Sequence, residues 1–220
     1  MVTMHGFPAS NYYNIVKHVL LYKEIPFTED LVYGGDELRK VSPLGKVPAL
    51  TTADGEPLSE TTVICDYLEE VYTRIPLYPE APVARARVRQ IMKVAELYLE
   101  LQSRRLIGHA FSGTAPSEAL KADVTHTTQR GLEALRRLCR FTPWIAGDTF
   151  TLADIYVRYV NAVVGSIGSK QLEWDILGEV PGMKDWMATM QDSDIARRVE
   201  SDRVANMPEF QAYFQDNFKK

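Results

Sequence analysis

The stretch GKVPALTTADGEPLSETTVICDYLEE, from Gly45 to Glu70, holds two short apolar runs and the start of a helix in one small segment. The apolar runs, 47–51 and 56–58, flank Asp54-Gly55, a dipeptide typical of a hairpin turn. From Val63 onward, apolar residues recur at helical spacing. The stretch therefore predicts a β-hairpin that leads directly into a helix.

The residues before this hairpin alternate between strand and helix patterns. Residues 2–6 and 27–32 are short strand candidates, and apolar residues recur at helical spacing over 12–20 between them. A short helix is expected over 36–41. The resulting order is β-α-β-α-β-β-α, which predicts a mixed sheet with helices packed on it.

A proline-rich segment follows this α/β region. Ile75–Pro82 holds three prolines, so a linker is predicted over 78–84. Beyond it the strand patterns nearly disappear, and long helices are expected over 85–111 and 117–140. The chain is thus predicted to form an α/β domain over 1–77 and an all-helical domain over 85–220.

The clearest local signal in the second half is GDTFTLADIYVRYVNAVV, from Gly147 to Val164. Thr151 is a helix N-cap candidate and Asp154 follows three residues later, which predicts a capping box with Asp in place of Glu or Gln. Phe150 and Ile155 are placed to form a hydrophobic staple around it. Thr151 and Asp154 are therefore interpreted as a structural cap that does not touch substrate.

Composition excludes several classes of function. With 220 residues, 45% hydrophobic content and a net charge of −4, the chain is typical of a globular protein without an electrostatic footprint for nucleic acid. The two cysteines, Cys65 and Cys139, form no CxxC motif, and the four histidines form no ligand-spaced pair, so no metal site is predicted. Neither a membrane span nor a signal peptide is recognisable, so a soluble cytoplasmic protein is expected.

Four motifs together resemble the cytosolic glutathione transferases, of a serine-type, bacterial-like kind without an assigned class. These motifs are GKVPAL, LSETTVICDYLEE, IAGDTFTLADIYV and VPGMKDWMATM. The resemblance covers essentially the whole chain. It implies a thioredoxin-like N-terminal domain followed by a helical-bundle C-terminal domain, with glutathione as co-substrate and no metal. It also implies a homodimer, in which the helix around 67–72 and the start of the helix at 85–89 meet across a two-fold axis.

The resemblance places Ser10 on the catalytic serine of the serine-type classes, with LYKEIPF as the anchor. Its hydroxyl would donate a hydrogen bond to the glutathione thiolate. Lowering a thiol pKa by about two units requires roughly 2.7 kcal/mol, an order of energy that a helix N-terminus and a hydroxyl donor supply. From the residues alone Ser10 is a simple N-cap, and Asn11, Tyr12 and Tyr13 are alternative donors.

The other glutathione contacts also follow from the resemblance. Val47 would offer its backbone N–H and C=O to the cysteinyl unit, and a cis bond to Pro48 would turn that edge towards the ligand. Glu60 and Thr61, at the start of the third helix, would hold the γ-glutamyl carboxylate and ammonium. Lys46 would pair with the glycyl carboxylate. From the residues alone these are a turn proline, a helix cap and a surface lysine.

The implied activity is the transfer of glutathione to small apolar electrophiles, typical of detoxification. Candidates for the electrophile site are Phe7, Tyr12, Tyr98 and His109. A glutathione-dependent isomerase or dehalogenase, and a non-catalytic binding protein of the same fold, remain alternatives. Ile15 stands where the family often has a basic residue, and Thr61 stands in the place of the commoner serine, which leaves the class open.

Overall fold

The computed structural model describes residues 1–218 and divides into two compact units. The first contains Met1–Pro76 together with the C-terminal segment that starts at Asp192, and the second is Leu77–Gln191. The division expected from the sequence differs at two places. The predicted linker 78–84 lies within the second unit, and everything after residue 84 was assigned to the helical domain. The C-terminal helix instead belongs to the unit that carries the β-sheet.

The first unit is built on a four-stranded mixed sheet in the order β2-β1-β3-β4. Strand β1 (Val2–Gly6) pairs in parallel with β2 (Phe27–Leu31) and antiparallel with β3 (Ala49–Thr51). Strand β4 (Pro57–Ser59) pairs antiparallel with β3 across the predicted turn at Asp54-Gly55. The alternation in β1 points Val2 and Met4 into the core, where both side chains are fully buried.

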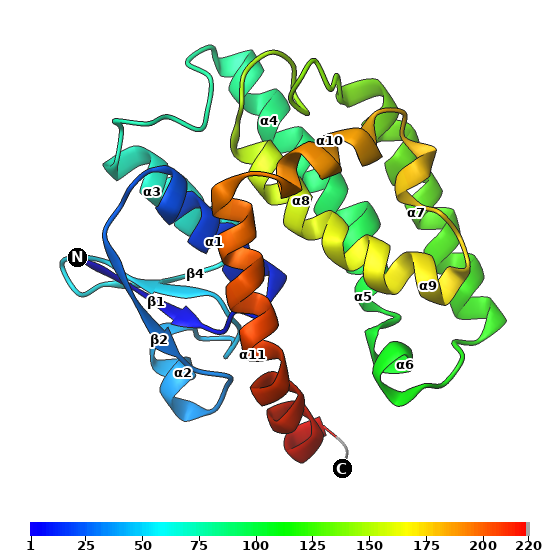
Figure 1. Cartoon of the computed structure of the whole chain (residues 1–220), viewed down its shortest axis with the longest axis horizontal. Coiled ribbons are helices and arrows are strands. Elements are labelled where there is room, and N and C mark those ends of the chain that lie inside the picture. Colours follow the sequence, from blue (N-terminus) through cyan, green and yellow to red (C-terminus); the bar gives the residue numbers. More distant parts are fainter. Residues whose placement is uncertain (219–220) are drawn as a thin grey trace. The chain divides into compact units, whose positions relative to one another are not determined.

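Three helices alternate with these strands, in the predicted order (Figure 1). They are α1 (Asn11–Tyr22), α2 (Asp36–Val41) and α3 (Thr61–Val71). Helices α1 and α3 pack against each other, and their apolar faces are buried in the core of this unit. This arrangement is the thioredoxin-like domain that the resemblance implied.

The C-terminal helix α11 (Asp194–Phe218) runs beside α1 (Figure 1). A buried lysine joins the two helices to the sheet. The Lys17 side chain is only 3% exposed, and its ammonium pairs with Glu29 of β2 at 2.7 Å and with Asp202 of α11 at 2.8 Å. Because a buried ammonium needs opposite charges around it, the pair with Asp202 favours the packing of α11 against α1.

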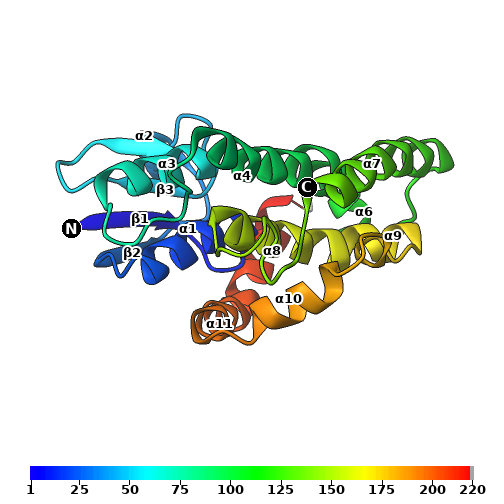
Figure 2. The same ribbon diagram turned by 90° about the horizontal axis from the view of Figure 1, so that it is seen from above.

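The second unit is helical, and α4 (Pro82–Ala95) packs against both α7 (Glu118–Leu138) and α8 (Leu152–Val163) (Figure 2). The single helix expected over 85–111 begins three residues earlier and is interrupted by a π-helical turn and a short break. The remaining elements are the π-helical segments Glu96–Glu100 and Val164–Gly168, α5 (Leu101–Arg104), α6 (Ile107–Ser112), α9 (Ser169–Leu172), the 3₁₀ turn Leu177–Glu179 and α10 (Met183–Gln191).

The predicted capping box at the start of α8 is present. The Asp154 carboxylate is fully buried, and its Oδ2 accepts hydrogen bonds from the Thr151 N–H at 2.9 Å and the Thr151 hydroxyl at 3.2 Å. Its Oδ1 accepts from the Ile145 N–H at 2.8 Å and from Trp186 Nε1–H at 2.9 Å. Burial raises the pKa of Asp154, and these four hydrogen bonds oppose that rise. Asp154 therefore joins three segments of the helical unit, which is more than a cap.

Among the residues that the structure describes, none of the helices combines the length and apolar character needed to cross a bilayer.

Candidate glutathione site

The predicted glutathione-binding residues converge at one end of the sheet. In the strand register His5 lies opposite Ala49, and Ala49 lies opposite Ser59. The C-terminal ends of β1 and β4 and the N-terminal end of β3 therefore meet at the same edge. The segments adjoining the strands at this edge are Phe7–Ser10, Lys46–Pro48 and Glu60–Thr61.

Gly6 shows how closely the backbone is packed at this edge. Its φ of 144° is in the region that favours glycine. A Cβ at Gly6 would lie 2.7 Å from Tyr13 Cδ2 and 3.0 Å from Val47 Cβ, so a larger residue would push these neighbours apart. The Val47–Pro48 peptide bond is cis, as the resemblance implied, and Pro48 is buried.

Ser10 is the N-cap of α1. Its backbone N–H donates to the Phe7 carbonyl at 3.1 Å, and its Oγ accepts a hydrogen bond from the Tyr13 N–H at 3.4 Å. Capping uses a lone pair of the hydroxyl oxygen and leaves the hydroxyl proton available. The two interpretations of Ser10 made from the sequence, helix cap and thiolate donor, are therefore compatible.

The structure removes one of the alternative donors. Tyr13 is 1% exposed, and its hydroxyl donates to the Glu29 carboxylate. Burial, with the Glu29 hydrogen bond, holds the pKa of Tyr13 well above its ordinary value. Its proton is therefore committed to Glu29. Asn11 and Tyr12 occupy the first two helical positions, are half-buried and remain alternatives to Ser10.

The start of α3 has two features of an anion site. Glu60, just before the helix, has a φ of 72°, a conformation that costs a non-glycine residue about 1–3 kcal/mol and that clusters at functional sites. No side chain within residues 1–218 caps this helix, so its first-turn N–H groups lack a capping partner. Thr61 is the first helical residue and is 7% exposed. Such a helix N-terminus suits a carboxylate.

Two unpaired charges lie at the same edge. The Lys46 and Glu60 side chains are both exposed, and neither forms an ion pair or side-chain hydrogen bond with any other described residue. The positive charge of Lys46 suits a carboxylate of a ligand, and the negative charge of Glu60 suits an ammonium group of the same ligand. Because both are exposed, each can stay solvated until a ligand arrives.

An aromatic cluster begins at Phe7, one of the predicted electrophile contacts. The Phe7 ring stacks on Tyr33 with ring centroids 4.9 Å apart and on Phe210 of α11 with centroids 5.2 Å apart. Tyr33 in turn stacks on Tyr213 at 5.0 Å. Phe7 is half-buried, so part of an aromatic surface remains open within the first unit.

The other predicted electrophile contacts are distributed over both units. Tyr12 lies on α1 of the first unit. Tyr98 lies in the π-helical segment of the second unit and is 36% exposed, and His109 lies in α6, where its Nδ1 and the Thr114 hydroxyl share a hydrogen bond of 3.0 Å. The joint role of these residues therefore stays a prediction.

Two asparagines beside Ser10 were missed by the sequence reasoning. Asn14 Nδ2 donates to the Pro8 carbonyl at 2.9 Å, and Asn206 Oδ1 accepts from the Ala9 N–H at 3.1 Å. Neither asparagine belongs to a recognisable motif. The only available signal was the polar character of Asn14 inside an apolar helix face.

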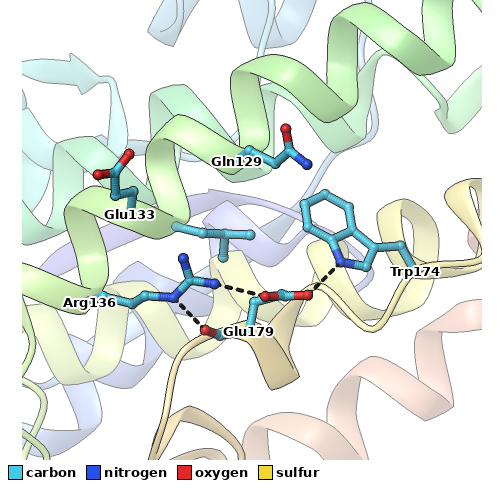
Figure 3. Close-up of a pocket in the computed structure, with 6 residues that line it drawn as sticks. Gln129, Glu133, Arg136, Trp174 and Glu179 are labelled. Carbon is cyan, nitrogen blue, oxygen red and sulfur yellow. Dashed lines mark hydrogen bonds and ion pairs between the residues drawn. The ribbon is translucent and has the colours of Figure 1, made fainter.

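A separate cavity of about 320 Å³ lies within the helical unit and contains none of the predicted site residues (Figure 3). Its polar groups largely satisfy one another: Arg136 Nε donates to the Glu179 carbonyl at 2.7 Å, and the guanidinium pairs with the Glu179 carboxylate. Trp174 Nε1 donates to the same carboxylate at 3.1 Å. The donors of this cavity are thus largely engaged with Glu179, and none of them belongs to the predicted chemistry.

Within the described residues, the cysteines and potential metal ligands do not form a second site. Both Cys65 and Cys139 are buried, and burial raises the pKa of their thiols, that of Cys139 to about 12. In the part of the chain that the structure describes, no three His, Cys, Asp or Glu side chains are grouped to hold a metal ion.

Comparison with known proteins identifies the family. Residues 4–76 match the family model of the glutathione S-transferase N-terminal domain, and residues 63–194 match that of the C-terminal domain. The chain is also 38% identical over 212 residues to a glutathione S-transferase of Pseudomonas putida, a match that spans 96% of each protein. The chain belongs to the glutathione S-transferase family.

Further relatives of this transferase include an isomerase. A maleylacetoacetate isomerase of Pseudomonas aeruginosa is 29% identical over 142 residues, which cover 62% of this chain and 66% of the isomerase. Among solved structures, a bacterial zeta-class maleyl pyruvate isomerase aligns with a TM-score of 0.70 at 23% identity, over 90% of this chain and 95% of that one. Poplar glutathione transferase F1 aligns with a TM-score of 0.76 at 21% identity, over 93% and 98% of the two chains. At these identities the two structures establish the fold of the transferase.

Proposed function

We propose that this transferase binds glutathione at the sheet edge described above and stabilises its thiolate through the Ser10 hydroxyl. The thiolate then attacks a small apolar electrophile. One observation carries the proposal: a hydroxyl at the N-terminus of α1 and the uncapped N-terminus of α3 lie at the same end of the sheet. A cysteine thiolate and a γ-glutamyl carboxylate require two such sites close together.

Each neighbouring residue has a defined role in this proposal. The first-turn N–H groups of α3 and the Thr61 hydroxyl hold the γ-glutamyl carboxylate, and Glu60 holds the ammonium. Val47 pairs its backbone with the cysteinyl unit, as an added strand would. Lys46 meets the glycyl carboxylate. Opposite charges on protein and ligand are matched at both ends of the tripeptide.

The electrophile is proposed to approach the thiolate along the aromatic surface at Phe7. This ring is half-buried and begins the turn that ends at Ser10. A planar apolar substrate gains contact area on such a ring without desolvating a charge. Tyr12, Tyr98 and His109 remain the proposed further contacts.

The decisive experiment separates the capping role of Ser10 from its role as a donor. Ser10→Ala removes both, whereas Ser10→Asp keeps an N-cap acceptor but replaces the donor with a carboxylate. Ser117→Ala is the matched control, because Ser117 caps α7 in the same way by accepting from the Leu120 N–H at 3.3 Å. Turnover of an aryl halide and the ultraviolet titration of the bound glutathione thiol are measured for each variant.

We expect Ser10→Ala and Ser10→Asp to lower kcat/KM by about 100-fold, since roughly 2.7 kcal/mol of thiolate stabilisation is lost. The pKa of the bound thiol should return towards its value in free glutathione. Ser117→Ala should leave both quantities unchanged. Full activity in both Ser10 variants would instead assign the donor role to Asn11 or Tyr12.

A second candidate function is the glutathione-dependent isomerisation of a maleyl-type substrate. The likeness to maleylacetoacetate isomerase and to maleyl pyruvate isomerase favours it. In such a reaction the sulfur adds and leaves again, so glutathione is not consumed, whereas conjugation consumes one glutathione per product. Product analysis by NMR with limiting glutathione therefore distinguishes the two activities.

We also propose that the transferase is a cytoplasmic homodimer that uses α3 and the start of α4. Exposed apolar side chains on these helices support the proposal: Val63 and Val71 are 50% and 52% exposed, and Val83 is 76% exposed. In the proposed dimer the partner would cover these side chains. Light scattering should give twice the mass of one chain, and Val83→Glu should lower it.

A further inference from the structure

The turn before Ser10 is held through a single peptide group. The carbonyl of Pro8 and the N–H of Ala9 belong to the same peptide unit. The carbonyl accepts from Asn14 Nδ2 of α1 at 2.9 Å, and the N–H donates to Asn206 Oδ1 of α11 at 3.1 Å. The plane of this peptide is thereby fixed from both sides, one residue before Ser10.

The orientation of the Asn206 amide is itself determined by its partners. The Ala9 N–H can only donate, so the amide oxygen must face it. The amide nitrogen then donates to the Tyr33 hydroxyl at 2.6 Å. Asn206 is 8% exposed, and Tyr33 is stacked between Phe7 and Tyr213. The Asn206 amide is therefore buried, and its two hydrogen bonds allow it only one orientation.

One face of α11 carries all of these contacts. Asp202, Asn206 and Phe210 follow each other at intervals of four residues and so lie on the same side of the helix. Asp202 pairs with Lys17 of α1, Asn206 binds the peptide before Ser10, and Phe210 stacks on Phe7. The same face thus contacts α1, the Phe7 ring and the Ala9 N–H.

We infer that Asn206 is a positioning residue for Ser10, which makes the C-terminal helix part of the thiolate site. This inference rests on the proposed function, because Asn206 acts through Ser10 and touches no substrate. Without the Asn206 amide, the Pro8–Ala9 peptide can rotate about its remaining bond to Asn14. The Ser10 hydroxyl would then move relative to the sulfur.

The test uses the full-length protein with Asn206→Ala, which retains a good helix former in α11. Tyr33→Phe is the second variant, since it removes the oxygen that orients the Asn206 amide but keeps the ring that stacks on Phe7. Asn217→Ala is the control, because Asn217 lies on the same helix, is exposed and, among the residues that the structure describes, donates a side-chain hydrogen bond only to the Tyr213 carbonyl. The readouts are kcat and KM with an aryl halide, the ultraviolet titration of the bound glutathione thiol, and the thermal unfolding midpoint.

We expect Asn206→Ala to lower kcat about tenfold, because a misplacement of about 1 Å can lower a rate up to ~100-fold. The bound thiol should titrate at higher pH than in the native protein, and KM for glutathione should change little. Tyr33→Phe should shift kcat and the titration in the same direction by a smaller factor. Asn217→Ala should match the native protein.

A double-mutant cycle adds a second criterion. Asn14→Ala and Asn206→Ala release the same peptide unit, so their effects on kcat should not be additive. Additive effects would overturn the shared role in this peptide.

The outcomes separate this inference from the Ser10 proposal. If Asn206→Ala lowers only the unfolding midpoint and leaves kcat and the thiol titration unchanged, Asn206 is merely structural and the inference is wrong, while a large effect of Ser10→Ala keeps the Ser10 proposal. If the native protein itself does not shift the titration of bound glutathione, both fail together.

Discussion

Replacing Asp154 by asparagine is the sharpest test of how the helical unit is held together. The native carboxylate is fully buried and accepts four hydrogen bonds, two on each oxygen. An asparagine side chain offers one accepting oxygen and one donating NH₂ group. Whichever way the amide turns, its NH₂ group then faces two groups that donate hydrogen bonds to the native carboxylate.

The expected loss of stability can be worked out from these partners. If the NH₂ group faces Thr151, the Thr151 hydroxyl can rotate to accept, but the Thr151 N–H stays buried without an acceptor. One such unsatisfied group costs about 1–3 kcal/mol, and the lost cap adds about 1 kcal/mol. Together these costs amount to about 2–4 kcal/mol. This sum is the upper bound for the destabilisation of the unit by Asp154→Asn, because removal of a buried charge offsets part of it. Asp154→Ala loses all four bonds and should destabilise the unit more.

Urea unfolding followed by tryptophan fluorescence is a suitable assay, because all three tryptophans, Trp144, Trp174 and Trp186, lie in the helical unit. Ser117→Ala serves as the cap-only comparison, with an expected loss of about 1 kcal/mol. A loss for Asp154→Asn no larger than for Ser117→Ala would refute the reasoning, since Asp154 would then act as an ordinary cap.

Three further predictions concern the backbone and the cysteines. Gly6→Ala should lower both stability and glutathione affinity, because its Cβ would displace Tyr13; calorimetry and binding titration check this, and retention of both would contradict it. Glu60→Gly should relieve the positive φ and raise the free energy of unfolding by up to about 1 kcal/mol while weakening glutathione binding; destabilisation would argue against strain at this residue. Burial raises the folded-state pKa of Cys139 to about 12, so its contribution to stability is complete below the unfolded pKa of about 8.5 and is lost as pH rises towards the folded value. Cys139→Ala should therefore lose stability less steeply than the native protein between these values, by up to ~1.4 kcal/mol per pH unit, as measured by urea unfolding; equal slopes would contradict it.

Local signals determined most of the secondary structure. The Asp54-Gly55 turn, the apolar alternation around it and the Thr151–Asp154 pair each act between residues a few positions apart. Such interactions hardly depend on the rest of the fold, so the β-α-β-α-β-β-α order and the capping box could be predicted. The break between α5 and α6 was missed, because the apolar pattern of 85–111 continues through it.

The sequence by itself also determined which residues gather at the sheet edge, since the order of strands and turns brings the segments around Ser10, Val47 and Glu60 to one end. Only the tertiary structure decided which of their neighbours are free to act. In the folded protein the Tyr13 hydroxyl donates to Glu29 and is not free to act. Helix α11 belongs to the first unit, where Asn206 binds the peptide before Ser10. The physical reason is that a helix displays its own polar and apolar faces in its sequence, but the surface that those faces cover is set by packing between residues far apart in the chain.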